Sequence, residues 1–157
     1  LAGLLRDVVA SEVVGRIRNS FSGRDPAELA RRQQGYAILQ RSVAKLSAAG
    51  AAIILGGDTG LEDNIFGYAE HKELELMVGA GMTSSGAIVA ATSRAAEFVG
   101  LTDRGTLAPG KRADLLVLDA NPLDDIRNTR RIAKFYLAGV EVDRAALKAS
   151  LTGSARQ

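Results

Sequence analysis

The chain has 157 residues, of which 46% are hydrophobic and 24% charged, and its formal net charge is +2. This length allows one domain or parts of two, and the composition is that of an ordinary globular protein. The sequence contains no cysteine, which excludes a disulfide framework, a thiolate nucleophile and a cysteine zinc knuckle. No apolar stretch approaches the roughly 20 residues that cross a bilayer, and the basic cluster at residues 127–134 lacks interleaved aromatics. We therefore expect no membrane partner, no nucleic-acid partner and a cytoplasmic location.

Two helices are predicted before residue 51. Apolar residues at helical spacing predict the first over residues 2–18. In the second, Asp25 can cap free amides, Pro26 suits the first turn, and Gly50 tolerates the left-handed geometry that ends helices. One apolar stripe runs along this second helix: Tyr36, Leu39, Val43 and Leu46.

The run "AAIILGGDTG" at residues 51–60 raises the question of function. Its apolar half does not alternate with polar residues, which is typical of a parallel strand that is covered on both faces. The run then ends in two glycines and Asp58, so this acid is either a carboxylate placed to do chemistry or a residue that caps or turns a loop. One strand and its helix cannot bury both faces of that strand. We therefore expect further strands outside this sequence, which starts at Leu1 and holds a single histidine, His71.

The second half of the chain changes from helices to short strands. Helices are predicted over residues 70–81 and 83–99, the latter capped by Thr83 or Ser84. After a boundary at residues 101–110, "ADLLVLD" and "IAKFYLAGVEVD" predict strands with a hairpin turn at Ala138-Gly139, and Asp143 begins a terminal helix. The predicted divisions are thus an α/β part (1–100), a β-rich part (101–145), and a helix end with a tail (146–157).

Several motifs together resemble those of a known enzyme family. They are "AAIILGGDTG", "HKELELMVGAGMTSSGAIVAATSRAAEFVGL", "GTLAPGKRADLLVLDANPLDDI" and "YLAGVEVD". The stretch from about residue 25 to residue 143 resembles the C-terminal part of a metal-dependent amidohydrolase, in the branch that includes imidazolonepropionase-like and Xaa-Pro dipeptidase-like enzymes. The third motif is the most specific, with Gly105, Pro109-Gly110-Lys111, Ala113-Asp114, four apolar residues and Asp119 in that order.

The resemblance implies a fold. Residues 51–57 look like the last strand of a (β/α)8 TIM barrel, residues 70–99 like the helices that close it, and residues 105–143 like part of a small β-sandwich. In such a barrel the working groups lie at the carboxyl ends of the strands, where Asp58 would be. The remainder of the barrel would be missing from this chain.

The resemblance also implies a metal site. Family members hold one or two divalent ions, here expected to be zinc, through histidines and a bridging residue on strands that this chain lacks. Of the site residues of that family, only one has a counterpart in this sequence. That counterpart is Asp58, which the resemblance implies to be a metal contact and proton shuttle. A bound zinc ion lowers the pKa of its water to roughly 7, and a nearby carboxylate can pass the proton of that water to the leaving nitrogen.

Other side chains are weaker candidates for the site. His71, near a helix start, is a candidate substrate-binding residue, with packing or capping as the alternative. Glu70 and Glu73 could together bind a cation, and Thr59 and Asn64 could line the mouth of the site.

These inferences predict a fragment of a hydrolase that cleaves a C–N bond in a small amide, a cyclic amide or a dipeptide. The segment alone is expected to be inactive, and the intact protein could form a homo-oligomer. Two alternatives stay open: an aromatic-ring deaminase of the same superfamily, and a non-catalytic assembly or binding module.

Overall fold

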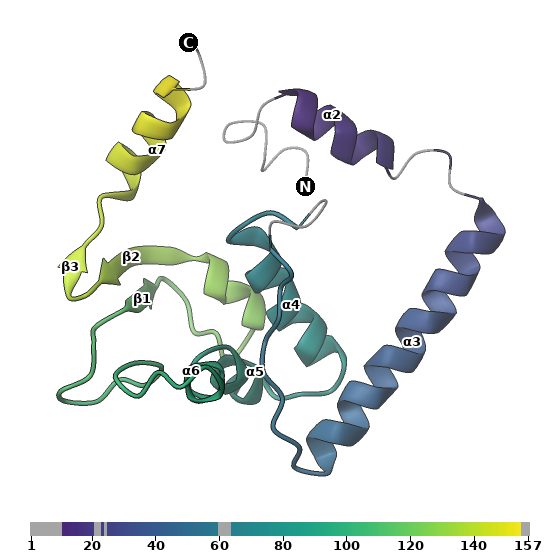
Figure 1. The fold of residues 1–157 in the computed structure, drawn as a ribbon, viewed down its shortest axis with the longest axis horizontal. Coiled ribbons are helices and arrows are strands. Elements are labelled where there is room, and N and C mark those ends of the chain that lie inside the picture. Colours follow the sequence, from purple (N-terminus) through teal and green to yellow (C-terminus); the bar gives the residue numbers. More distant parts are fainter. Residues whose placement is uncertain (1–10, 21–22, 24, 60–63, 155–157) are drawn as a thin grey trace. The chain divides into compact units, whose positions relative to one another are not determined.

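The computed structural model describes residues 11–20, 23, 25–59 and 64–154. It divides into two compact units, one formed by residues 1–34 with 143–157 and the other by residues 35–142. Figure 1 shows the order of the elements along the chain. The candidate site lies within the second unit.

The first unit is helical in its described residues. It contains helix α2 (Ser11–Ser20) and the beginning of helix α3 (Pro26–Ala48), whose residues from 35 onward belong to the second unit. The start of the predicted first helix, residues 1–10, lies outside the described residues. The Asp25 carboxylate accepts a hydrogen bond from the Ala27 amide at 3.0 Å, so the predicted cap of the second helix is confirmed. Helix α7 covers Arg144–Ser154 and starts where predicted, because the Asp143 carboxylate caps its first amides.

Helices α4 (Tyr68–Gly79), α5 (Ser84–Ala91) and α6 (Ser93–Phe98) form the centre of the second unit. Their core is compact because small side chains let the helices approach closely: Ala87 and Ala90 are fully buried. Four larger residues complete this core cluster: Leu74, Met77, Met82 and Ile126.

The predicted strand at residues 51–57 is not a strand in this structure. The stretch packs Ile53 and Leu55 against the core cluster, as its apolar sequence requires. Strands exist by pairing with other strands, and no described strand lies beside this one. The Leu55 amide instead donates a hydrogen bond to the Ala90 carbonyl of α5 at 3.2 Å.

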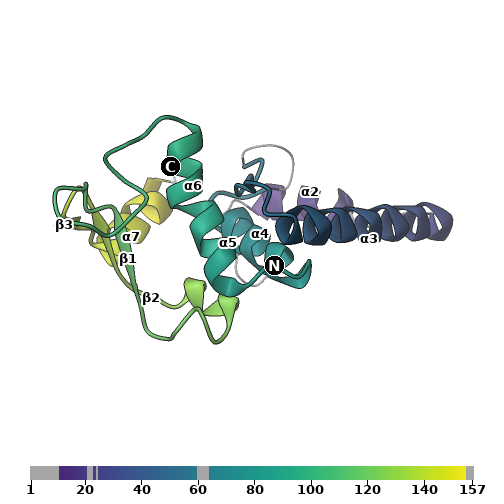
Figure 2. The same ribbon diagram turned by 90° about the horizontal axis from the view of Figure 1, so that it is seen from below.

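The predicted helix at residues 83–99 is two helices. The Thr83 side chain caps α5 as expected, accepting from the Gly86 amide at 3.0 Å. At Thr92 the backbone leaves helical geometry, with φ −122° and ψ −89°, and the helical path divides into α5 and α6 (Figure 2). Gly105 packs into this break, where a Cβ would lie 2.8 Å from the Ala96 Cβ and 3.0 Å from the Thr92 carbonyl oxygen.

The β-rich part is a three-stranded antiparallel sheet in the order β1 (Leu115–Leu118), β2 (Ile132–Leu137) and β3 (Val140–Glu141). The predicted hairpin turn is confirmed: Ala138 and Gly139 have φ of 51° and 82°, as a type I′ turn requires. The Asp114 carboxylate accepts the Ala138 amide at 2.7 Å and secures this turn. The 3-10 helix η1 (Ile126–Arg130), which Asp125 caps, joins β1 to β2 and packs on α4.

Replacing Gly105 with alanine should destabilise the second unit, because the new Cβ meets backbone and Ala96 at a positive φ of 89°. We expect the free energy of unfolding to fall by about 1–3 kcal/mol, measured by chemical denaturation. Gly110→Ala is the matched control, since Gly110 has a φ of 81° but nothing within 4 Å of a Cβ. Equal losses in the two variants would contradict the packing role of Gly105.

Candidate functional site

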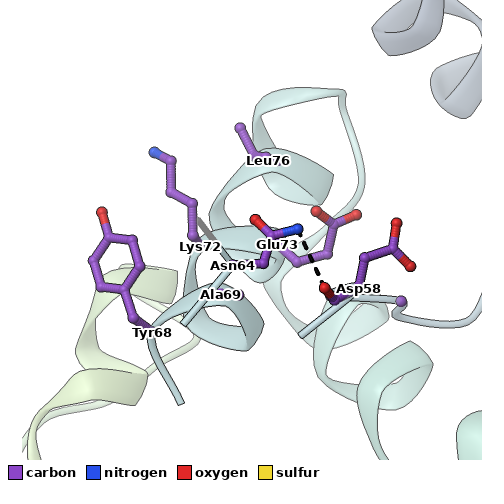
Figure 3. A pocket seen from close by; sticks show the side chains of 9 residues that line it. Asp58, Asn64, Tyr68, Ala69, Lys72, Glu73 and Leu76 are labelled. Atoms are coloured by element: carbon purple, nitrogen blue, oxygen red, sulfur yellow. Dashed lines mark hydrogen bonds between the residues drawn. The ribbon is translucent and has the colours of Figure 1, made fainter. Parts of the chain in front are cut away.

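A pocket of about 180 Å³ opens between residues 56–58 and one face of α4. The helix contributes Tyr68, Lys72 and Leu76, which are one turn apart and therefore form a row along one face. Glu73 lies beside this row, toward Asp58 (Figure 3). The pocket is thus lined by acids on one side and by potential hydrogen-bond donors on the other.

Asp58 occupies the loop side of the pocket in an unusual backbone conformation. Its φ is 45°, a left-handed geometry that aspartate tolerates better than most residues with a side chain. Asn64 holds the loop by donating its side-chain amide to the Asp58 carbonyl oxygen at 3.3 Å. The carboxylate takes no part in that bond, and Figure 3 shows it extending from the loop next to Glu73.

Glu70 secures the loop to the start of α4. Its carboxylate accepts from the Gly67 amide at 2.7 Å and from the Thr59 hydroxyl. Burial alone would raise the pKa of Glu70, but hydrogen bonds from Thr59 and from the amides of Glu70 and Gly67 outweigh it and lower the pKa. Glu70 is therefore an ionised structural anchor. Two residues were expected at the mouth of the site. Asn64 lines the pocket, whereas the Thr59 hydroxyl donates its hydrogen bond to Glu70 and Thr59 does not line the pocket.

Glu73 differs from Glu70 because burial dominates its environment. Desolvation, together with the negative charge of Asp58, raises the pKa of Glu73. The sequence offered Glu73 only as a partner of Glu70 in binding a cation, whereas in the structure Glu73 lines the pocket and Glu70 bonds to Gly67 and Thr59. The signal that could have found this position is the helical spacing of Glu73 from Ala69 and Leu76, which also line the pocket.

His71 lies on another face of α4, toward η1, and does not line the pocket with Asp58. Its Nδ1 is 3.0 Å from the Thr129 hydroxyl oxygen. That hydroxyl already donates its single proton to the Ile126 carbonyl at 2.8 Å, so Nδ1 is the donor to Thr129. Burial, followed by the positive charge of Arg130, lowers the pKa of His71. This position supports the packing alternative, and substrate contact by His71 stays a prediction.

A charged network joins the pocket to η1. Arg130 forms an ion pair with Glu75 at 2.7 Å, and its guanidinium lies 4.9 Å from the centre of the Tyr68 ring. Glu75 also pairs with the Lys72 ammonium at 3.1 Å. Arg130 is therefore linked to both Tyr68 and Lys72, two residues of the pocket wall.

The described residues do not form a metal site by themselves. Catalytic zinc sites use three protein ligands, and no group of three or more potential ligands occurs in the described part of the chain. Asp58 fits the role of one oxygen ligand, because its carboxylate lies at the pocket. The other ligands of any such ion would have to come from elsewhere.

Comparison with known proteins gives the family. Residues 27–142 match the sequence model of the Amidohydrolase family. The chain belongs to this family. It is 38% identical over 86 residues to an imidazolonepropionase of Deinococcus deserti, a match that covers 54% of this chain and 21% of that protein. The resemblance drawn from the motifs is thereby confirmed.

Solved structures agree with this family assignment. A putative prolidase from Bifidobacterium longum is 38% identical with a TM-score of 0.61, and the match covers 73% of this chain and 30% of that one. Phenylurea hydrolase B is 36% identical with a TM-score of 0.61, over 66% of this chain and 26% of that one. The amidohydrolase relationship and the α/β class are therefore established. The chain spans about a fifth to a third of the length of these relatives.

The described residues contain no helix that is long and apolar enough to cross a membrane.

The lowered pKa of His71 predicts a specific pH dependence of stability. The fold favours neutral His71, so its contribution is fully present above the ordinary pKa of 6.5 and is lost as the pH falls through the lower folded value. We expect the free energy of unfolding, measured by denaturant titration from pH 8 to pH 5, to fall more steeply in the natural chain than in His71→Gln. Glutamine can still donate to Thr129 but does not titrate. Parallel pH profiles would contradict this assignment.

Proposed function

We propose that this chain is the C-terminal part of a metal-dependent hydrolase that cleaves a C–N bond in a small amide, a cyclic amide or a dipeptide. The observation that carries the proposal is the Asp58 carboxylate at a pocket, directly after an apolar run, in a chain of the Amidohydrolase family. The names of the similar proteins, an imidazolonepropionase and a putative prolidase, support a C–N bond as the target.

In this proposal residues 51–57 are the last strand of a (β/α)8 barrel, and the β-rich part belongs to a small sandwich. Two observations support a missing remainder of the barrel. The apolar run has no strand beside it among the described residues. In the predicted stripe on α3, Val43 packs against the core cluster, but Leu39 and Leu46 are exposed, at 64% and 53%. Exposed apolar surface of this kind is typical of a face that another segment covers.

The proposed chemistry needs a strong nucleophile at neutral pH and a proton for the leaving nitrogen. A divalent ion, zinc by expectation and held mainly by ligands outside this chain, would supply the Lewis acid that polarises the carbonyl and acidifies a water. Asp58 would contact that ion, accept the proton of the water at a carboxylate oxygen, and deliver it to the departing nitrogen. Its exposed position at the pocket leaves the carboxylate accessible to substrate.

The neighbouring residues would set the conditions for Asp58. Asn64 holds the backbone of the loop, so the carboxylate keeps its position as the proton moves. Burial and the negative charge of Asp58 raise the pKa of Glu73, so Glu73 ionises less readily than a solvated glutamate would.

Asp58→Asn should remove activity in the full-length protein that contains this segment. Asparagine keeps the size of the side chain but cannot carry the proton, so we expect kcat to fall by about 100- to 10,000-fold. The measurement is turnover on a panel of amides, cyclic amides and dipeptides with zinc present.

Asp119→Asn is the control, because Asp119 is also an exposed aspartate that follows an apolar run, but it does not line the pocket. Unchanged turnover in Asp58→Asn would contradict the proton-carrier role. Release of ammonia from aromatic rings, without amide cleavage, would favour a deaminase. Metal-free, inactive full-length protein would favour a binding module. The segment alone should show no turnover.

A further inference from the structure

The pocket has a second polar side that the proposed chemistry does not use. Tyr68 and Lys72 are four residues apart on α4, so their side chains lie on the same face of the helix. Figure 3 shows the Tyr68 hydroxyl and the Lys72 ammonium directed to the same side of the pocket, away from Asp58. Both groups are hydrogen-bond donors.

Lys72 belongs to a group of three charged side chains, with Glu75 and Arg130, that carries one net positive charge. Glu75 is the carboxylate that pairs with Lys72, at 3.1 Å. The same carboxylate also pairs with Arg130, at 2.7 Å. One negative charge therefore faces two positive charges, and an excess of one positive charge remains. The Lys72 side chain is 45% exposed and has two further N–H groups to donate.

A contact with Arg130 restrains the Tyr68 ring, so the Tyr68 hydroxyl can donate to the same ligand as Lys72. The Arg130 guanidinium lies over the Tyr68 ring at 4.9 Å, a cation–π contact that restrains the ring. The hydroxyl at the other end of the side chain makes no hydrogen bond to any described residue. Lysine and tyrosine together thus present two donors and one positive charge.

We propose that Tyr68 and Lys72 form a subsite for a carboxylate group of the substrate, at the opposite side of the pocket from Asp58. A carboxylate has two acceptor oxygens for the two donors, and its single charge matches the excess positive charge. A phosphate is a poorer match, because its charge of about −1.5 to −2 would lie in the same small pocket as Asp58 and Glu73. The inference rests on the proposed function and narrows it to amides that carry a carboxylate.

The test is a binding measurement that needs no turnover. Levulinate copies N-acetylglycine without its C–N bond, and levulinyl alcohol replaces the carboxylate with a neutral hydroxymethyl group. Isothermal titration calorimetry of the full-length protein should give a Kd for levulinate about tenfold lower than for the alcohol, as expected for a charge-assisted hydrogen bond. Lys72→Met should remove this preference, and Lys72→Arg, which keeps the charge, should retain most of it.

Lys134→Met is the matched control. Lys134 also pairs with a glutamate, Glu141, at 3.0 Å, and its side chain is exposed to a similar degree, but it lies on β2, away from the pocket. This variant should keep the full preference for levulinate. Tyr68→Phe should reduce the preference by a few fold, since one donor of two is lost.

The failures of the two proposals are distinguishable. Equal affinities for levulinate and the alcohol, no binding of either, or a preference that survives Lys72→Met would overturn the subsite, whatever the turnover. A preference that depends on Lys72 in a protein without amide hydrolysis would support the subsite and contradict the proposed function. Circular dichroism of each variant, with Lys72→Arg as the folded reference, separates loss of the fold from loss of the subsite.

Discussion

The packing of α4 is the constraint on which the rest of the structure depends. Leu74 and Met77 are buried in the core cluster, so the rotation of the helix about its axis is set. Because 3.6 residues make one turn, that rotation places Tyr68 and Lys72 on the face that lines the pocket with residues 56–58. The pocket therefore exists as a consequence of core packing, and a change in the helix's buried side would move every group that the helix presents.

The β-rich part of the chain contributes to the same pocket through η1. Arg130 lies at the end of this short helix and reaches Tyr68 and Glu75, while Thr129 accepts from His71. These contacts explain why residues on both sides of the predicted boundary near residue 100 form one compact unit, 35–142. The network is polar and only partly buried, so it contributes little to the free energy of unfolding. Its main effect is to orient the side chains that it joins. Residues well after Asp58 in the chain therefore orient side chains that line the pocket.

The sequence predicted the features whose signals are local. The cap at Asp25, the turn at Ala138-Gly139 and the terminal helix after Asp143 each depend on residues within one turn of one another. The break at Thr92, into which the distant Gly105 packs, has no such local signal and was missed. The strand at residues 51–57 requires partners that the described chain does not supply. Asp58 was predicted from its position after an apolar run, and Glu73 was considered as a cation ligand. The position of Tyr68 and Lys72 at the same pocket became recognisable only when the loop was seen against the helix.

The central claim, that Asp58 contacts a catalytic metal ion, is tested most directly by locating the ion. Crystals of the full-length protein grown with zinc, with anomalous diffraction collected at the zinc absorption edge, would show its position. The account predicts an ion about 2.0–2.2 Å from an Asp58 carboxylate oxygen, with its remaining ligands on strands outside this segment. An ion bound elsewhere, with the Asp58 carboxylate facing solvent and far from any metal, would contradict it.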